Sequence, residues 1–178
     1  MLHRTASELD TGLAEILASP KNEGRLELIV IRPTKGEREV LSEGQLTHTD
    51  GLDGDCWKDR SPHPDMQVNI MNARAIALIA GDRERWPLAG DQLYVDFDLS
   101  EANLPPGSRL ELGSAVLEVT DKPHTGCHKF AARFGVDAVK FVNSIRGRSL
   151  NLRGVNAKVV KPGVIRPGDR VLKIAEQK

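Results

Sequence analysis

The chain is organised around one stretch, which reads Ala115-Val116-Leu117-Glu118-Val119-Thr120-Asp121-Lys122-Pro123-His124-Thr125-Gly126-Cys127-His128-Lys129-Phe130. Its first part, residues 115–119, is apolar and alternating, and this pattern predicts a β-strand. Pro123 and Gly126 then interrupt the pattern, because these two residue types mark turns and loops. The sequence therefore predicts a strand that runs into a turn, and this turn presents a thiol among polar side chains.

Cys127 is the candidate functional residue of this turn. His124 and Thr125 precede it, and His128 and Lys129 follow it. Nearby positive charge favours the thiolate over the thiol, so the pattern predicts a reactive cysteine. A buried, unreactive cysteine is the alternative, because free cysteine often packs in protein cores. The density of polar groups in a loop favours a functional site.

The second cysteine, Cys56, lies in a different setting. It follows Asp53 and Asp55 in a glycine-containing loop. The negative charges of the two aspartates predict a higher thiol pKa and a poorer nucleophile. We therefore expect Cys127 to react faster than Cys56 near neutral pH.

The composition indicates one globular domain. The chain has 178 residues, of which 39% are hydrophobic and 28% are charged, and this length allows a sizeable core. No apolar run approaches the roughly 18 residues of a membrane helix, and the N-terminus lacks the apolar core of a secretion signal. Two cysteines do not make a disulfide framework. We expect a reducing, cytoplasmic setting and no membrane partner.

The net charge is zero, but the charge is unevenly distributed. Residues 1–119 carry 12 basic and 21 acidic side chains, a net charge of −9, whereas residues 120–161 carry nine basic and two acidic side chains, a net charge of +7. This basic stretch predicts a site for a small-molecule or cofactor ligand with an anionic group, such as a phosphate. A solvated basic face is the alternative. Aromatic residues are only 4%, and no nucleic-acid motif occurs, so nucleic acid is not an expected partner.

The N-terminal segment predicts a helix. Leu9, Leu13 and Ile16 recur at helical spacing and predict an amphipathic helix over residues 6–18, with Ser7 as its N-cap. We expect residues 1–24 to form a helical extension that rests on the main body.

Most of the remaining chain predicts short strands separated by glycine and proline turns. The expected strands lie at 25–32, 37–46, 66–70, 93–98, 109–112, 115–120, 156–160 and 170–174, and the expected helices at 72–80, 130–134 and 136–145. Many short strands with few helices are typical of a barrel. The sequence therefore predicts a mainly β fold over residues 25–175, a closed or nearly closed β-barrel with a few short helices.

Five short motifs stand in one order along this domain. They are Gly51-Leu52-Asp53-Gly54-Asp55, Gly90-Asp91-Gln92-Leu93, Pro123-His124-Thr125-Gly126-Cys127, Arg153-Gly154-Val155-Asn156-Ala157 and Pro167-Gly168-Asp169. Each motif alone is weak, but the ordered set with one cysteine in the late loop resembles the MOSC domain. This module occurs at the C-terminus of molybdenum-cofactor sulfurases and in small stand-alone bacterial proteins. The resemblance covers roughly residues 25–175.

The resemblance implies a β-rich barrel that binds a molybdenum cofactor or handles sulfur for it. The family's cysteine falls on Cys127, which would ligate the metal or carry a persulfide. His124, Thr125 and His128 would orient the loop. The residues implied to contact the cofactor or its anionic group are His124, Thr125, His128, Lys129, Arg133, Arg148, Arg153 and Asn156.

The implied activity is sulfur transfer or the reduction of N-hydroxylated compounds, as in the mitochondrial amidoxime-reducing enzymes. A redox protein or a sulfur-donor protein would be its partner, and the family is also associated with pyridoxal phosphate. A non-catalytic carrier of a metal–sulfur or pterin cofactor is the alternative. A zinc site built from His124, Cys127, His128 and Cys56 is a weaker alternative, because this spacing does not match paired ligand hairpins.

Overall fold

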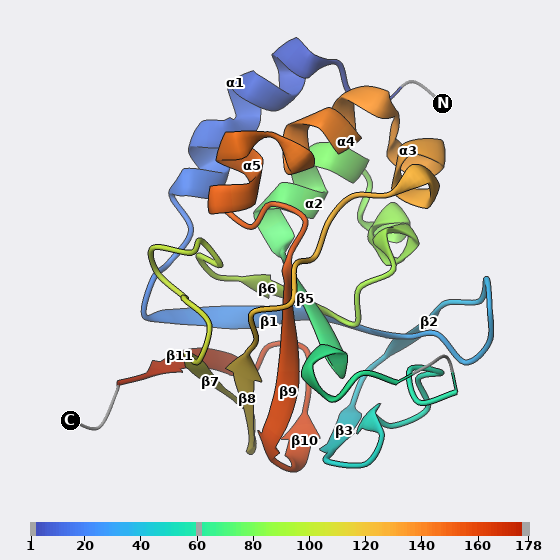
Figure 1. The fold of residues 1–178 in the computed structure, drawn as a ribbon, viewed down its shortest axis with the longest axis vertical. Coiled ribbons are helices and arrows are strands. Elements are labelled where there is room, and N and C mark those ends of the chain that lie inside the picture. Colours follow the sequence, from blue (N-terminus) through green and yellow to red (C-terminus); the bar gives the residue numbers. More distant parts are fainter. Residues whose placement is uncertain (1–2, 60–61, 176–178) are drawn as a thin grey trace.

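The computed structural model describes residues 3–59 and 62–175. Strands and helices are segregated: the strands form a barrel, and the five α-helices of the described residues gather at one side of it (Figure 1). None of the helices in these two ranges is long and apolar enough to cross a membrane.

Seven strands close the barrel. Their order is β11 (Arg170–Ile174), β7 (Arg109–Leu112), β8 (Ala115–Val119), β9 (Val155–Lys161), β5 (Val68–Asn72), β6 (Leu93–Asp96) and β1 (Glu23–Ile31). The ring closes because the start of β1 pairs with β11. Neighbouring strands are antiparallel except β5 and β6, which are parallel. The mainly β, barrel fold predicted from the sequence is confirmed.

Four short strands complete the β structure. β2 (Glu39–Leu41) extends the sheet by pairing with the far end of β1. β3 (Gly44–Thr47), β4 (Gly51–Leu52) and β10 (Gly163–Ile165) form a separate three-stranded sheet. The segment 37–46, expected to be one partner of β1, therefore divides between two sheets.

The barrel interior is filled by the alternating apolar residues that the sequence pattern indicates. In β8 the side chains of Ala115, Leu117 and Val119 are buried, and the two residues between them are partly exposed. These side chains join a cluster with Phe97 and Leu110. Burial of each large apolar side chain contributes about 1.5–3 kcal/mol to stability.

A helical layer forms the second core. It contains α1 (Ala6–Leu17), α2 (Ala73–Ala80), α3 (His128–Phe134), α4 (Val136–Asn143) and α5 (Ile145–Ser149), with short 3-10 helices η1 (Pro64–Met66) and η2 (Arg83–Ala89). The side chains that bury between these helices and the barrel include Leu9, Met71, Tyr94 and Phe130.

The N-terminal helix differs from its prediction in its cap. Its N-cap is Thr5 rather than Ser7, because Thr5 and Glu8 form a reciprocal capping box that Ser7 does not form. The predicted apolar face of α1 is buried, because Leu9 and Leu13 pack in the second core. Strand β1 begins at Glu23, so the last two residues of the expected extension, 1–24, belong to the barrel. Residues 1–2 of that extension lie outside the described residues.

The segment 146–153, for which the sequence predicts no strand or helix, begins with helix α5 over residues 145–149. The Ser144 side chain caps this helix by accepting a hydrogen bond from the Gly147 backbone N–H.

Candidate functional site

The loop between β8 and α3 carries the candidate site, and asparagine side chains hold both of its ends. Asn156 Nδ2 donates to the carbonyl oxygens of Lys122 (3.0 Å) and Pro123 (3.3 Å). Asn143 binds Gly126 through two hydrogen bonds of 2.9 Å, one to its N–H and one to its carbonyl. Asn143 on α4 therefore holds Gly126, the residue before Cys127, and Asn156 on β9 holds the start of the loop.

Cys127 is exposed at the start of α3. Burial raises the pKa of its thiol, but the backbone N–H groups of Phe130 and Lys129 and the positive charges of Arg153 and Lys129 outweigh burial, so the pKa is lowered overall. The sequence predicts a lowered thiol pKa from the neighbours His124, His128 or Lys129. The structure retains Lys129 as a cause and adds Arg153, which is distant in the sequence.

Cys127 opens into a pocket of about 560 Å³ that we call the cationic pocket. Among the described residues, five basic side chains line it and no acidic side chain does. Its basic lining residues are Lys35, Arg38, Lys129, Arg133 and Arg153. Neither Lys35 nor Lys129 forms an ion pair with a described residue, so both ammonium groups are available to an anion. The pocket thus combines a thiol with concentrated positive charge.

A buried charged cluster forms the wall behind this pocket. Asp91 is fully buried and accepts a hydrogen bond of 2.6 Å from Arg153. The same guanidinium donates to the Ala89 carbonyl (2.9 Å) and lies over the Phe130 ring, 4.9 Å from its centroid. A buried arginine needs such an array, because an uncompensated charge in the core is costly.

His124 lies against this cluster rather than beside the thiol. Its Nδ1 is 3.4 Å from Asp91 Oδ1, and neither atom has a hydrogen-bond partner among the described residues. Burial and the positive charge of Arg153 lower the pKa of His124 to about 4, although Asp91 opposes the effect. The imidazole is therefore neutral near pH 7. Gly154 makes room for it: its φ is +105°, and a Cβ there would lie 2.4 Å from the Ile70 carbonyl oxygen and 3.3 Å from His124 Nδ1.

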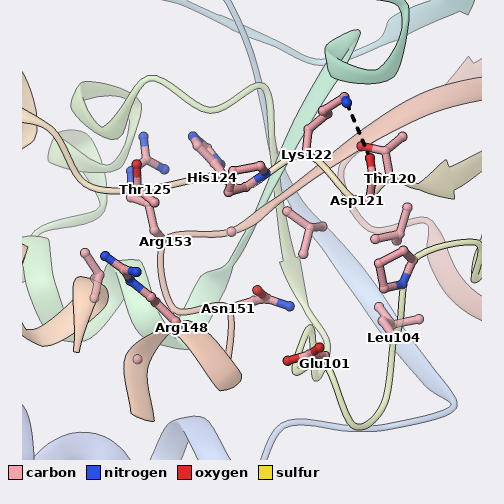
Figure 2. Close-up of a pocket in the computed structure, with 17 residues that line it drawn as sticks. Glu101, Leu104, Thr120, Asp121, Lys122, His124, Thr125, Arg148, Asn151 and Arg153 are labelled. Carbon is pink, nitrogen blue, oxygen red and sulfur yellow. Dashed lines mark ion pairs between the residues drawn. The ribbon is translucent and has the colours of Figure 1, made fainter. Parts of the chain in front are cut away.

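A second pocket, which we call the loop pocket, is lined by residues 119–125 among others and has a volume of about 250 Å³. Figure 2 shows Thr125, Arg148 and Arg153 on one side of it and Leu104, Thr120 and Asp121 on the other. Arg153 lines both pockets, and Cys127 lines only the cationic pocket.

The structure divides the residues that the sequence grouped together. Cys127, Lys129, Arg133 and Arg153 line the cationic pocket, whereas His124, Thr125, Arg148 and Arg153 line the loop pocket. Two predicted contact residues, His128 and Asn156, line neither of these pockets. His128 is exposed on α3, and Asn156 is fully buried and holds the loop.

Sequence reasoning missed four residues that shape the site: Lys35, Arg38, Asp91 and Asn143. Asp91 was noticed only within a motif, without a role. The others carried no local signal, because they come from distant segments that only the fold brings to Cys127. Gly90-Asp91 at the start of a strand was the one clue present in the sequence.

Cys56 has a different environment from the one predicted. Its side chain is 6% exposed. The neighbouring carboxylate of Asp55 is paired with Arg32, at 2.7 Å, so it is not a free negative charge beside the thiol.

Within residues 3–59 and 62–175, no group of three or more histidine, cysteine or acidic side chains could hold a metal ion, and the zinc alternative is therefore wrong for these residues.

We expect iodoacetamide to label Cys127 well before Cys56 near neutral pH. Cys127 is exposed and its thiol pKa is lowered, whereas burial shields Cys56 from the reagent. Mass spectrometry of peptides after brief treatment at several pH values measures both thiols at once. The labelling of Cys127 should reach half its maximal rate at a lower pH than that of a free cysteine. First labelling of Cys56 would contradict this prediction.

Comparison with known proteins agrees with this fold. The family model described as MOSC domain matches residues 43–172, and no curated protein matches the chain. The YuaD protein from Bacillus subtilis has a similar structure, with a TM-score of 0.60 and 20% identity over 87% of this chain and 97% of that chain. YiiM from Escherichia coli gives a TM-score of 0.57 and 20% identity over 86% of this chain and 71% of that chain. At this identity the two likenesses show the fold alone.

Proposed function

Because the chain belongs to the MOSC domain family, we propose that it binds a molybdenum cofactor through Cys127. One observation carries the proposal: an exposed thiol with a lowered pKa opens into a pocket that the described part of the chain lines with five basic side chains and no acidic one. Neutral or acidic surroundings would not favour a thiolate and an anion together.

The residues present fit such a group. A thiolate is a soft ligand of the kind that soft metal centres prefer, and Cys127 supplies one. The cofactor also carries a phosphate, which Lys35, Lys129 and Arg133 can hold by charge-assisted hydrogen bonds. A pocket of about 560 Å³ lies within the usual range for small-molecule and cofactor sites.

Each part of the chain then has a defined task. Cys127 provides the ligand atom, and Asn143 and Asn156 hold the loop so that the thiol keeps its place. Asp91 orients Arg153, which stabilises the thiolate from the pocket wall. When bound, the cofactor would supply the redox or sulfur chemistry of the family, and a redox protein would exchange electrons in the reduction of an N-hydroxylated compound.

Persulfide carriage is a second candidate, favoured by the exposure of Cys127. The Cys127 thiolate would attack the outer sulfur of a donor protein's persulfide. A new S–S bond would form at Cys127, and the donor cysteine would leave as its thiolate. The lowered thiol pKa raises the thiolate fraction near neutral pH. Mass spectrometry would detect the gain of one sulfur atom at Cys127 after incubation with such a donor.

The cofactor proposal predicts that Cys127→Ser abolishes molybdenum loading. The protein is purified from a host that makes the cofactor, and molybdenum and phosphate are measured per chain. We expect loading in the original protein and in Cys56→Ser, and none in Cys127→Ser, because the hydroxyl is a poor substitute for the soft thiolate. Full loading of a folded Cys127→Ser variant would contradict the proposal.

Charge variants test the role of the cationic pocket in the same experiment. Lys35→Glu with Lys129→Glu reverses two charges in the pocket, and Lys140→Glu with Arg146→Glu reverses two charges of the basic stretch outside it. We expect only the first pair to reduce loading strongly, since local hydrogen bonds matter more than net charge. Equal losses in both pairs would mean that the overall field attracts the ligand.

A further inference from the structure

The loop pocket is a separate site from the cationic pocket. Its walls come from the loop after β8, from the segment 101–106, from helices α4 and α5, and from residues 151–155. The two pockets share only Arg153 among their lining residues. His124 and Thr125 face the loop pocket, while Cys127 and Lys129 line the cationic pocket. A ligand in one pocket therefore does not fill the other.

We propose that the loop pocket binds a small monocarboxylate with an apolar body. The inference does not depend on the proposed function, because Cys127 takes no part in it. It rests on the charge balance of the pocket, on its apolar floor and on two polar groups that have no partner.

The charges of the loop pocket are almost balanced, unlike those of the cationic pocket. Arg153 is paired with buried Asp91 at 2.6 Å, and Lys122 lies 3.7 Å from Asp121. Arg148 and Glu101 remain among the charged lining residues. The Arg148 guanidinium has no ion pair or hydrogen bond with any residue in the described part of the chain. It is the lining cation that can still pair with a single negative charge.

An unpaired acidic side chain makes a dianion a poor occupant. Glu101 lines the pocket without an ion pair to a described residue, and Figure 2 shows it apart from Arg148. Its carboxylate repels a phosphate dianion about twice as strongly as a carboxylate with one negative charge. A carboxylate fits better because its single charge can remain next to the guanidinium.

The floor of the loop pocket is apolar. Leu104, Val119 and Val142 are at most 3% exposed, and each contributes to the lining. A cavity of about 150 Å³ is large enough to hold benzene, so a pocket of about 250 Å³ has room for a ring of that size with a carboxylate. The apolar body would rest on this floor and gain from removal of its surface from water.

Recognition of the carboxylate would come from Arg148 and Thr125. Arginine presents two parallel N–H groups that match the two oxygens of a carboxylate. Figure 2 shows Thr125 on the same side of the pocket as Arg148, and its hydroxyl has no hydrogen-bond partner among residues 3–59 and 62–175. Both groups can therefore donate to the same ligand.

Titration with benzoate, cyclohexanecarboxylate, benzamide and phenyl phosphate tests this inference by ¹H–¹⁵N NMR on the full chain. We expect the two carboxylates to shift the amide signals of Thr125, Asn151 and Gly154, and to leave those of Lys35 and Lys129 in place. Benzamide, which lacks the charge, and phenyl phosphate, which carries more charge, should bind more weakly.

Arg148→Gln and Arg146→Gln form the matched pair of variants. Both residues lie on α5, and only Arg148 lines the pocket. Arg148→Gln should weaken carboxylate binding by about tenfold or more, as expected for loss of a hydrogen bond to a charged group, and Arg146→Gln should change it little. The inference is overturned if neither carboxylate binds, if benzamide or phenyl phosphate binds as tightly, if the shifts map to the cationic pocket, or if Arg148→Gln binds normally.

Discussion

Replacing Asp91 by alanine is expected to lower the free energy of unfolding by about 3–5 kcal/mol, the usual cost of removing one partner of a buried ion pair. Asp91 is fully buried and accepts a 2.6 Å hydrogen bond from Arg153, whose side chain is only 9% exposed. The alanine variant leaves that guanidinium in the core without its counter-charge. Urea unfolding followed by circular dichroism measures the loss.

Two comparisons show whether this loss comes from an uncompensated charge. Glu23→Ala removes one partner of the exposed Glu23–Arg170 ion pair and should change stability little. Asp91→Leu combined with Arg153→Met removes both buried charges, so the double variant should lose less than the sum of the two single variants. The Asp91–Arg153 pair would contribute little if the losses of the two single variants simply add up to the loss of the double variant. The same would follow if Asp91→Ala lost no more stability than Glu23→Ala.

Acid should destabilise the protein through His124, by about 3 kcal/mol between pH 6.5 and pH 4. The pKa of His124 is lowered from 6.5 to about 4 by burial, by Arg153 and, more weakly, by Arg32. In this window the unfolded chain binds a proton that the folded chain excludes, so stability falls as the pH falls. Below about pH 4 both states are protonated, and this group adds no further change. A shift of one pKa unit corresponds to about 1.4 kcal/mol.

Carboxylates also titrate in this range, so the measured quantity is a difference between variants. The free energy of unfolding is determined from pH 4 to pH 7.5 for the original protein, for His124→Gln and for His63→Gln. In His124→Gln, the fall in the free energy of unfolding between pH 6.5 and pH 4 should be smaller by about 3 kcal/mol. In His63→Gln this fall should be unchanged, because the His63 side chain is 47% exposed. An unchanged slope in His124→Gln would mean that the folded protein admits the proton.

The strands were predictable because their signal is local. The alternation in residues 115–119 follows from the geometry of a strand that packs one face inward, and glycine and proline mark its ends. Where a local pattern was weak, a stronger local interaction decided. Ser144 capped a helix over 145–149, and Thr5 with Glu8 fixed the start of α1.

The candidate site was only partly predictable. The sequence identified Cys127 and the basic stretch around it, but it treated that stretch as one field of charge. The structure divides it: Lys129 lines the cationic pocket, Arg148 lines the loop pocket, and Lys158 is paired with Glu118 at 3.1 Å. A charge count cannot show which charges are neutralised, since the partners are set by folding.

By itself, the sequence determined the barrel-forming strands, the turn that carries Cys127 and the excess of positive charge beside it. These properties depend on residues that are neighbours along the chain. Only the tertiary structure decided that Lys35 and Arg38 line the same pocket as the Cys127 thiol, that Asp91 pairs with Arg153, and that His124 is mostly buried and neutral. Those arrangements depend on contacts between residues more than 30 positions apart, and no local period or spacing encodes which distant segments meet.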